Sequence, residues 1–384
     1  MKNLLEGSFG RYVLPAIILQ SVLIGGGFAT GREIVEFGAK YGALGWLGGV
    51  GIFIGFVVMA ALMFEFARKY KAYNYRAVLK ELIGPFWFLF DIVYLLLAIL
   101  IIAIMASATG EILNSTLGLN YWVGVGLITA IVGVLNFYGK GLIERFKTWG
   151  TLALMLGYLL FATIVIATTW EDAINVLATG DTSYMTGEVS ILAVIWSGIL
   201  YVGYNLAVFP AALFTVKRQK SRKESLLSGL IAGVLMTFPW FMTYFSLLGF
   251  YPSEEVYGSS VPWLEMLNGF PTIVVVIFGI VVGWTLVETS SGMIHAFVDR
   301  TDSQMQELAN KSLTSGQKGL IAVGTLVLSV ILSQVGIIDL ISTGYTAMAY
   351  AMIAVFAIPL LTIGVYKIFF KKDDEVAVDH ASNE

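Results

Sequence analysis

Three consecutive glycines and a fourth, Gly25, Gly26, Gly27 and Gly31, interrupt the first apolar stretch of the chain. Each glycine costs a continuous helix about 1 kcal/mol relative to alanine, so the stretch predicts a broken helix. Inside a bilayer, non-helical backbone is tolerated only where it is buried in protein or lines a wet cavity. A broken first helix therefore predicts a binding site at mid-membrane depth.

The composition places this break in a membrane protein. Mean hydropathy is +0.82, 58% of the residues are hydrophobic and only 13% are charged, and the apolar runs repeatedly reach the length of a membrane span. The absence of cysteine excludes disulfides, thiolate metal sites and cysteine nucleophiles. We expect an all-α polytopic membrane protein with ten transmembrane helices at about 12–38 (broken), 43–67, 86–114, 121–138, 142–169, 189–215, 225–250, 271–297, 317–334 and 340–370.

The basic residues indicate the orientation of these spans. Of the 23 lysines and arginines, all but Arg32 and Lys40 fall in segments on one side of the predicted membrane. The positive-inside rule then predicts that both termini are cytoplasmic. We expect a multi-pass protein of the plasma membrane. An even number of spans places both termini on the same side of the membrane, which agrees with this orientation.

Three weak internal matches follow one another in the same order in both halves of the chain. Residues 21–28 match 197–204, residues 107–112 match 289–294, and residues 141–144 match 336–339. They divide the chain into a first five-helix repeat at 1–170, a second at 171–370, and a polar tail at 371–384. Because five is odd, the second repeat enters the membrane from the opposite face, which defines an inverted-topology repeat.

The first match pairs the glycine-rich break in span 1 with Gly198, Gly203 and Asn205 in span 6. Broken helices 1 and 6 related by a pseudo-two-fold axis describe the LeuT-type 5+5 architecture. The sequence Gly-Gly-Gly-Phe-Ala-Thr-Gly-Arg-Glu-Ile-Val-Glu-Phe (25–37) and Tyr-Asn-Leu-Ala (204–207) also resembles the YkvI-like membrane proteins of the amino acid–polyamine–organocation superfamily. This resemblance covers essentially the whole chain, and it implies the fold and a transport function more firmly than a substrate.

A substrate site is expected between the two breaks. Half-helix ends offer free N–H groups for an anionic substituent, and the glycines let a ligand approach the backbone. The alternative is that the glycines only allow close helix packing. The predicted substrate-binding residues are Gly25, Gly26, Gly27, Phe28, Tyr201, Tyr204 and Asn205, with Trp196 as a further candidate wall.

Three adjacent hydroxyls in span 8, Thr289, Ser290 and Ser291, suggest a Na⁺ site, because hard cations prefer oxygen ligands. LeuT-type sodium symporters resemble this arrangement, and the resemblance implies that the carbonyls of Ser21 and Ile24 complete the site. The alternative is that the hydroxyls bond to their own helix.

Charged residues inside spans are functional candidates by default. Glu288 is expected to carry a proton or to serve as a structural acid. Arg32 and Glu33, beside the break, resemble the outer-gate charges of this architecture, although a solvated helix end would explain them equally well.

These features predict a secondary active transporter that moves a small organic solute, an amino acid or a related amine or acid, by alternating access. Coupling to Na⁺ is favoured over H⁺, and a proton-coupled exchanger or a non-transporting sensor of the same fold are the alternatives. A channel would need more charged residues along a path, and an enzyme would need a nucleophile or metal cluster. We expect no organic cofactor, no nucleic-acid partner, and contact with the lipid bilayer; the oligomeric state is not predicted.

Overall fold

The computed structural model describes residues 7–138 and 140–371, without the side chains of residues 137–149, 151 and 308. Among these residues, eight helices are long and apolar enough to cross a membrane, and two shorter apolar helices, Phe9–Leu23 and Tyr121–Asn136, supply the other two expected spans. The surface agrees with a lipid environment, because large apolar side chains such as Leu192 and Leu320 are about three-quarters exposed (75% and 73%). Of the polar tail predicted at 371–384, the structure describes residue 371, and the rest lies outside the described residues.

The first half of the chain supplies five spans. The first consists of η1 (Phe9–Val13), α2 (Leu14–Leu23), α3 (Gly26–Thr30) and α4 (Arg32–Phe37), so it is broken as expected. The others are η2 (Ala39–Leu44) with α5 (Gly45–Lys69); α6 (Tyr75–Ile83), η3 (Gly84–Trp87) and α7 (Phe88–Leu117); α8 (Tyr121–Tyr138); and α9 (Lys140–Thr179).

The second half supplies the other five. They are α10 (Ile191–Asn205), η4 (Leu206–Ala212) and α11 (Leu213–Val216); α12 (Arg222–Leu248); α15 (Thr272–Ala309); α16 (Ser315–Leu332) with η5 (Ser333–Val335); and α17 (Ile337–Asp339), η6 (Leu340–Tyr345), α18 (Thr346–Met352), η7 (Ile353–Ala357), η8 (Leu360–Gly364) and α19 (Val365–Phe369). The short helices α13 (Glu254–Tyr257) and α14 (Pro262–Met266) precede α15. The division into repeats at 1–170 and 171–370 stays a prediction, and the match at 141–144 lies outside the described side chains.

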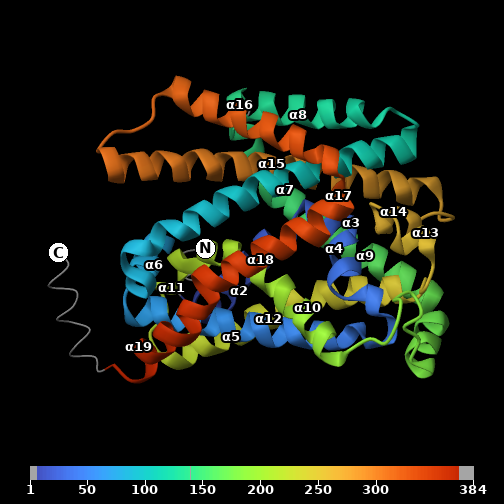
Figure 1. The fold of residues 1–384 in the computed structure, drawn as a ribbon, viewed down its shortest axis with the longest axis horizontal. Coiled ribbons are helices and arrows are strands. Elements are labelled where there is room, and N and C mark those ends of the chain that lie inside the picture. Colours follow the sequence, from blue (N-terminus) through green and yellow to red (C-terminus); the bar gives the residue numbers. More distant parts are fainter. Residues whose placement is uncertain (1–6, 139, 372–384) are drawn as a thin grey trace.

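The helices form two groups with the first span between them (Figure 1). In one group, α5 packs against α10 and α12, and small residues allow the close approach: Gly229 lies against the backbone of Ala61, and Gly233 against Val57. In the other group, α7, α8, α15 and α16 contact one another. The short helix α3 contacts α7 and α15, so the break of the first span is held against the second group.

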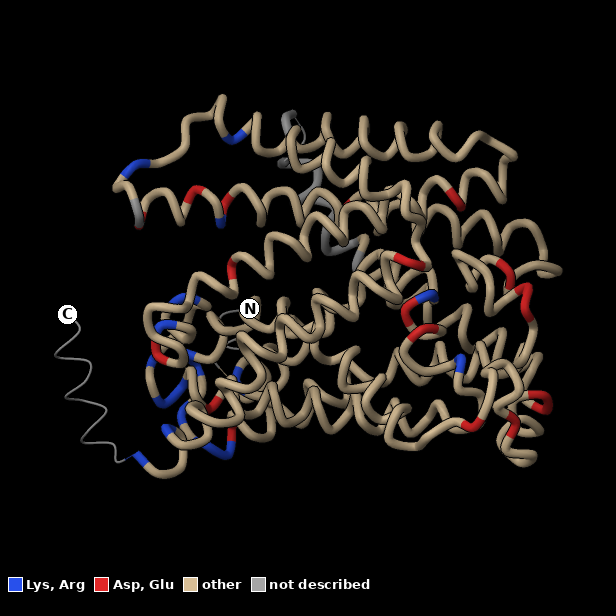
Figure 2. The backbone as a smooth tube through the Cα atoms, viewed as in Figure 1, with Lys and Arg blue, Asp and Glu red and all other residues tan. Residues whose placement is uncertain are grey.

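One end of the molecule is rich in Lys and Arg, and we call it the basic end (Figure 2). Contacts bring its segments together: Arg11 pairs with Glu224, Arg76 and Lys80 pair with Glu307, and Lys367 pairs with Glu81. These pairs join η1, α6, α12, α15 and α19 at the basic end.

The orientation can be tested in this cysteine-free chain. Ser183 lies before α10 at the end opposite the basic end, Ser221 lies just before α12 at the basic end, and both side chains are exposed. We expect an impermeant thiol reagent to label a Ser183→Cys variant in intact cells and a Ser221→Cys variant only after permeabilisation. Labelling of Ser221→Cys in intact cells would contradict the cytoplasmic assignment of the basic end.

Candidate functional site

The break of the first span lies at Ile24 and Gly25. Ile24 has φ −79° and ψ 80°, and Gly25 is extended at φ −108° and ψ −167°. The Gly25 N–H donates to Leu23 O (2.9 Å) and the Gly26 N–H donates to Thr289 Oγ1 of α15 (3.1 Å). Because a continuous helix would direct these two N–H groups to Ser21 O and Val22 O, the break removes the helical donors of both carbonyls.

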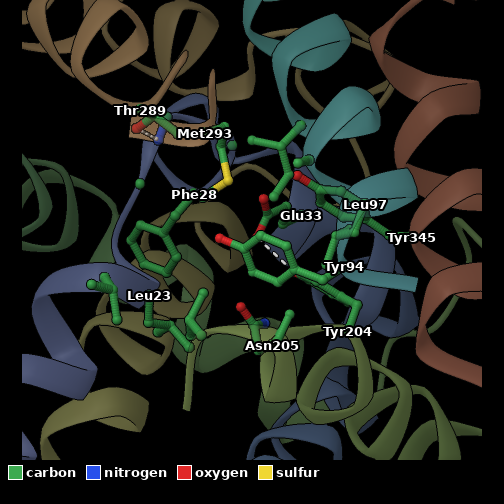
Figure 3. Close-up of a pocket in the computed structure, with 18 residues that line it drawn as sticks. Leu23, Phe28, Glu33, Tyr94, Leu97, Tyr204, Asn205, Thr289, Met293 and Tyr345 are labelled. Atoms are coloured by element: carbon green, nitrogen blue, oxygen red, sulfur yellow. Dashed lines mark hydrogen bonds between the residues drawn. The ribbon is translucent and has the colours of Figure 1, made fainter. Parts of the chain in front are cut away.

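A central cavity lies beside this break, between the two groups of helices. It leaves about 50 Å³ free, which is room for water and less than an organic solute of several heavy atoms needs. Its wall is mostly apolar, with a few polar side chains that point inward (Figure 3). The lining residues are Val22, Leu23, Gly25, Gly26, Gly27, Phe28, Glu33, Tyr94, Leu97, Ala98, Ile101, Tyr204, Asn205, Ala207, Val208, Thr289, Met293 and Tyr345.

Glu33 is the charged residue among those lining the cavity, and it is buried at 5% exposure. Its Oε2 accepts a hydrogen bond from the Tyr204 hydroxyl (2.6 Å), and the Tyr204 ring stacks on Tyr345 with centroids 4.3 Å apart. Its Oε1 lies against Gly27, where a Cβ atom would come within 2.0 Å of it. The absence of a side chain at Gly27 therefore makes room for the carboxylate.

Arg32 points away from Glu33, toward the end opposite the basic end. Its guanidinium donates to the carbonyls of Tyr257 and Ser259 and lies 3.4 Å from Glu36. These contacts hold the α13–α14 segment over the cavity. The structure thus separates the two predicted gate residues: Arg32 holds the covering segment, and Glu33 lines the cavity.

Aromatic side chains flank the cavity on both sides. Toward the α13–α14 segment, the Phe28 and Tyr158 rings are 5.3 Å apart, Tyr158 packs edge-on against Trp263, and the Tyr158 hydroxyl donates to Phe28 O (2.8 Å). Toward the basic end, the Arg300 guanidinium lies 3.6 Å from the centroid of Tyr94 and pairs with Asp91. These contacts lie on opposite sides of the cavity.

A second pocket, of about 120 Å³, lies on the other side of the break between α2, α9 and α15. Ser21, Ile24, Thr285, Glu288 and Thr289 are among its lining residues. The pocket therefore lies beside Ser21, whose carbonyl the break releases, and beside the side chains of Thr289 and Glu288. These oxygen atoms are of the kind that bind a hard cation.

The three hydroxyls of span 8 do not face this pocket together. Ser291 is buried and accepts a hydrogen bond from Asn136 of α8 (2.8 Å), and the buried Ser290 hydroxyl has no hydrogen-bond partner among the described residues. Only Thr289 of the three lines the pocket. The reason is geometric, because successive residues of an α-helix point about 100° apart.

The structure differs from expectation in span 6. Gly198 and Gly203 lie inside the continuous helix α10, where Gly198 packs on the backbone of Gly48 and Gly203 on Ala349. The interruption follows Asn205, as the 3₁₀ segment η4 with Pro210 inside it. Gly198 and Gly203 therefore serve helix packing.

The other predicted residues of α10 have different surroundings. Tyr204 and Asn205 line the cavity, whereas Tyr201 is buried behind them between the rings of Phe37 and Phe56. Trp196 is 41% exposed and donates to the Tyr350 hydroxyl (3.2 Å), so it does not line the cavity.

Tyr94, Met293 and Tyr345 line the cavity without having been predicted. Tyr94 and Met293 lie in long apolar helices that carry no break. Tyr345 ends the π-helical segment η6, a type of distortion that is frequent at functional sites but has no clear sequence signal here.

No protein-family model matches the chain. Among curated proteins, the uncharacterized membrane protein YkvI of Bacillus subtilis (strain 168) is 23% identical over 369 residues, which cover 91% of this chain and 95% of the relative. The chain thus resembles another membrane protein along almost its full length.

Solved structures with the same arrangement include membrane transport proteins. MhsT in complex with L-phenylalanine has a TM-score of 0.63 at 12% identity and covers 96% of this chain and 90% of its own. Inward-facing Mhp1 has a TM-score of 0.58 at 16% identity and covers 94% of this chain and 80% of its own. A substrate-bound, outward-open Na⁺-coupled sialic acid symporter has a TM-score of 0.54 at 16% identity and covers 93% of this chain and 88% of its own. The chain is therefore an all-helical, multi-pass membrane protein with the LeuT-type fold.

Proposed function

We propose that the protein is a secondary active transporter that moves a small organic solute by alternating access. The observation that carries this proposal is the central cavity, which lies beside the broken first span and is covered on both sides by aromatic and ionic contacts. In alternating access, a solute site with contacts on both sides opens to one side at a time to exchange its contents. Separation of Phe28 from Tyr158 would open it toward the α13–α14 segment, and displacement of Tyr94 would open it toward the basic end.

The names of the similar structures describe transport proteins or bound solutes, which supports the proposal of a secondary transporter. One is a Na⁺-coupled sialic acid symporter, one is bound to L-phenylalanine, and Mhp1 is described as a nucleobase-cation-symport-1 family transporter. A manganese transporter also has this arrangement, with a TM-score of 0.55. The fold thus serves several substrates, and the substrate of this chain must be argued from its own cavity.

Coupling to a cation is part of the proposal. The second pocket places Ser21, Glu288 and Thr289 next to the break, so an ion bound there would contact the same backbone that forms the cavity. We propose Na⁺ as the coupling ion, with H⁺ carried by Glu288 as the alternative. We further propose that the protein lies in the plasma membrane with the basic end in the cytoplasm.

Uptake into proteoliposomes tests the function. With purified protein and an inward Na⁺ gradient, we expect saturable uptake of a radiolabelled solute such as L-phenylalanine or L-leucine, and none into protein-free liposomes. Solute binding without uptake would indicate a sensor, and uptake that does not saturate would indicate a channel. Either result would contradict the proposal.

A further inference from the structure

The polar groups of the central cavity differ from those that would bind an anion. Glu33 supplies a carboxylate, and no lysine or arginine is among the lining residues. An anionic group placed here would lie beside an acidic side chain and would find no lysine or arginine among the lining residues to pair with, whereas a cation would stabilise the ionised carboxyl group. The charge of the cavity wall thus favours a solute that brings a positive charge.

Two further side-chain oxygens in the cavity are acceptors. The Asn205 amide nitrogen already donates to Tyr201 O (2.8 Å), and Figure 3 shows the amide oxygen on the cavity side. The Tyr204 hydroxyl is used by Glu33 Oε2 (2.6 Å), which leaves Glu33 Oε1 without a hydrogen-bond donor among the described residues. A group with several N–H donors would satisfy both free oxygens.

The aromatic walls suit the same group. Tyr204 and Tyr345 are stacked, Tyr94 lies on the basic side, and Phe28 lies on the other. A cation near the face of an aromatic ring is attracted by the ring quadrupole, and this attraction is strongest where water is excluded. A protonated amine therefore fits both the carboxylate and the rings.

We propose that the substrate carries an ammonium group and that Glu33 binds this group directly, with Asn205 Oδ1 as a second acceptor and the tyrosine rings around it. This inference rests on the proposed function, because it takes the central cavity as the solute site. It assigns to Glu33 substrate recognition in place of a role as a gate charge. The solute class is a small amine with an apolar body, amino acids included.

The test compares solutes that differ only in this group. The pairs are L-phenylalanine with L-3-phenyllactate and L-leucine with L-2-hydroxyisocaproate, in which a hydroxyl replaces the ammonium group. Isothermal titration calorimetry on the purified full-length protein, with Na⁺ present, should show that at least one amino acid binds about tenfold or more tightly than its hydroxy acid, as the loss of a hydrogen bond to a charged group implies. Equal binding within both pairs, or no binding by either amino acid or by phenethylamine, would contradict the inference.

Glu33→Gln should remove the difference, because the amide keeps the shape and an acceptor for Tyr204 but has no charge. Glu65→Gln is the matched control: Glu65 is buried at 3% exposure, pairs with Arg68 (2.7 Å) in α5 and does not line the cavity. We expect Glu65→Gln to preserve the discrimination. If Glu33→Gln does not fold, Glu33→Asp keeps the charge on a shorter side chain and should weaken amine binding several-fold while leaving the hydroxy acid unaffected. A Glu33 variant with undiminished discrimination would show that another group recognises the amine.

These results separate the two proposals. Amine-selective binding without uptake in proteoliposomes would contradict transport and leave the ammonium site in place. Uptake of the hydroxy acid as fast as the amino acid would contradict the ammonium site and leave transport in place.

Discussion

Replacing Gly27 with alanine is expected to weaken solute binding by about tenfold or more. The added Cβ would lie 2.0 Å from Glu33 Oε1 and 3.3 Å from the Tyr345 hydroxyl, so the carboxylate has to move. Because Glu33 is buried and held by Tyr204, that movement breaks the 2.6 Å hydrogen bond and shifts the charge away from the solute. A loss of one charge-assisted hydrogen bond costs about 1.5–3 kcal/mol, which corresponds to about tenfold or more in affinity.

Gly26→Ala provides the control for this prediction. A Cβ atom at Gly26 would approach the Met105 sulfur at 2.1 Å and Leu286 Cδ2 at 2.8 Å, which are the flexible ends of apolar side chains. These ends can move aside, so we expect a loss of about threefold or less in affinity. Titration calorimetry with L-phenylalanine and L-leucine measures both variants, and gel filtration confirms that each is folded. Unchanged affinity in a folded Gly27→Ala variant would show that the position of the Glu33 carboxylate does not determine binding.

The break of the first span could be predicted from sequence because its cause is local. Glycine at three consecutive positions destabilises a helix whatever its surroundings are, and Gly25, Gly26 and Gly27 do line the cavity. The membrane environment adds that such a break must be buried in protein or face a cavity. Tyr204 and Asn205 followed from the match to this segment, and both line the same cavity.

The interruption in span 6 was assigned to Gly198, Gly203 and Asn205, and it begins only after Asn205. Glycine inside a membrane helix is compatible with a break and with close packing, and Gly198 packs on Gly48. Pro210 was the better signal, because proline lacks the amide donor that a continuous helix needs, and it lies within η4.

Some side chains reach a site only because of how their helix is rotated about its axis, and these residues could not be placed from the sequence. Thr289 and Ser291 are two positions apart and face different neighbours, the break and Asn136. Tyr94, Met293 and Tyr345 reach the cavity only because α7, α15 and η6 pack around the first span. Nothing in their local sequence distinguishes them from other apolar positions.

The second large effect concerns the coupling ion, and Thr289 is the residue to change. Its hydroxyl accepts the Gly26 N–H and lines the second pocket, so it would bind Na⁺ while fixing the break. Thr289→Val keeps the shape and removes the oxygen, and we expect a loss of about tenfold or more in Na⁺-dependent solute affinity, because the ion loses a ligand and the Gly26 N–H loses its acceptor. Thr289→Ser keeps the oxygen and should bind nearly normally.

Ser290→Ala and Ser291→Ala distinguish the original three-hydroxyl hypothesis from the site that the geometry favours. Ser290 and Ser291 do not line the second pocket, so both variants should retain Na⁺-dependent affinity within about threefold, with Ser291→Ala losing only its contact to Asn136. A strong loss of Na⁺-dependent affinity in either variant, with Thr289→Val unaffected, would indicate that the serine pair binds Na⁺.

Glu288→Gln decides between the two coupling ions, because Glu288 lines the same pocket as Thr289. If Na⁺ is coupled, uptake should stop when choline replaces Na⁺, and Glu288→Gln should leave uptake driven by Na⁺, although weaker. If H⁺ is coupled, uptake should persist in choline and collapse when the proton gradient is dissipated. In that case Glu288→Gln should lose uptake but still exchange solute for solute, since the amide mimics only the protonated carboxyl. Because the pocket joins the Thr289 hydroxyl to a carbonyl released by the break, the first set of results is the one that we expect.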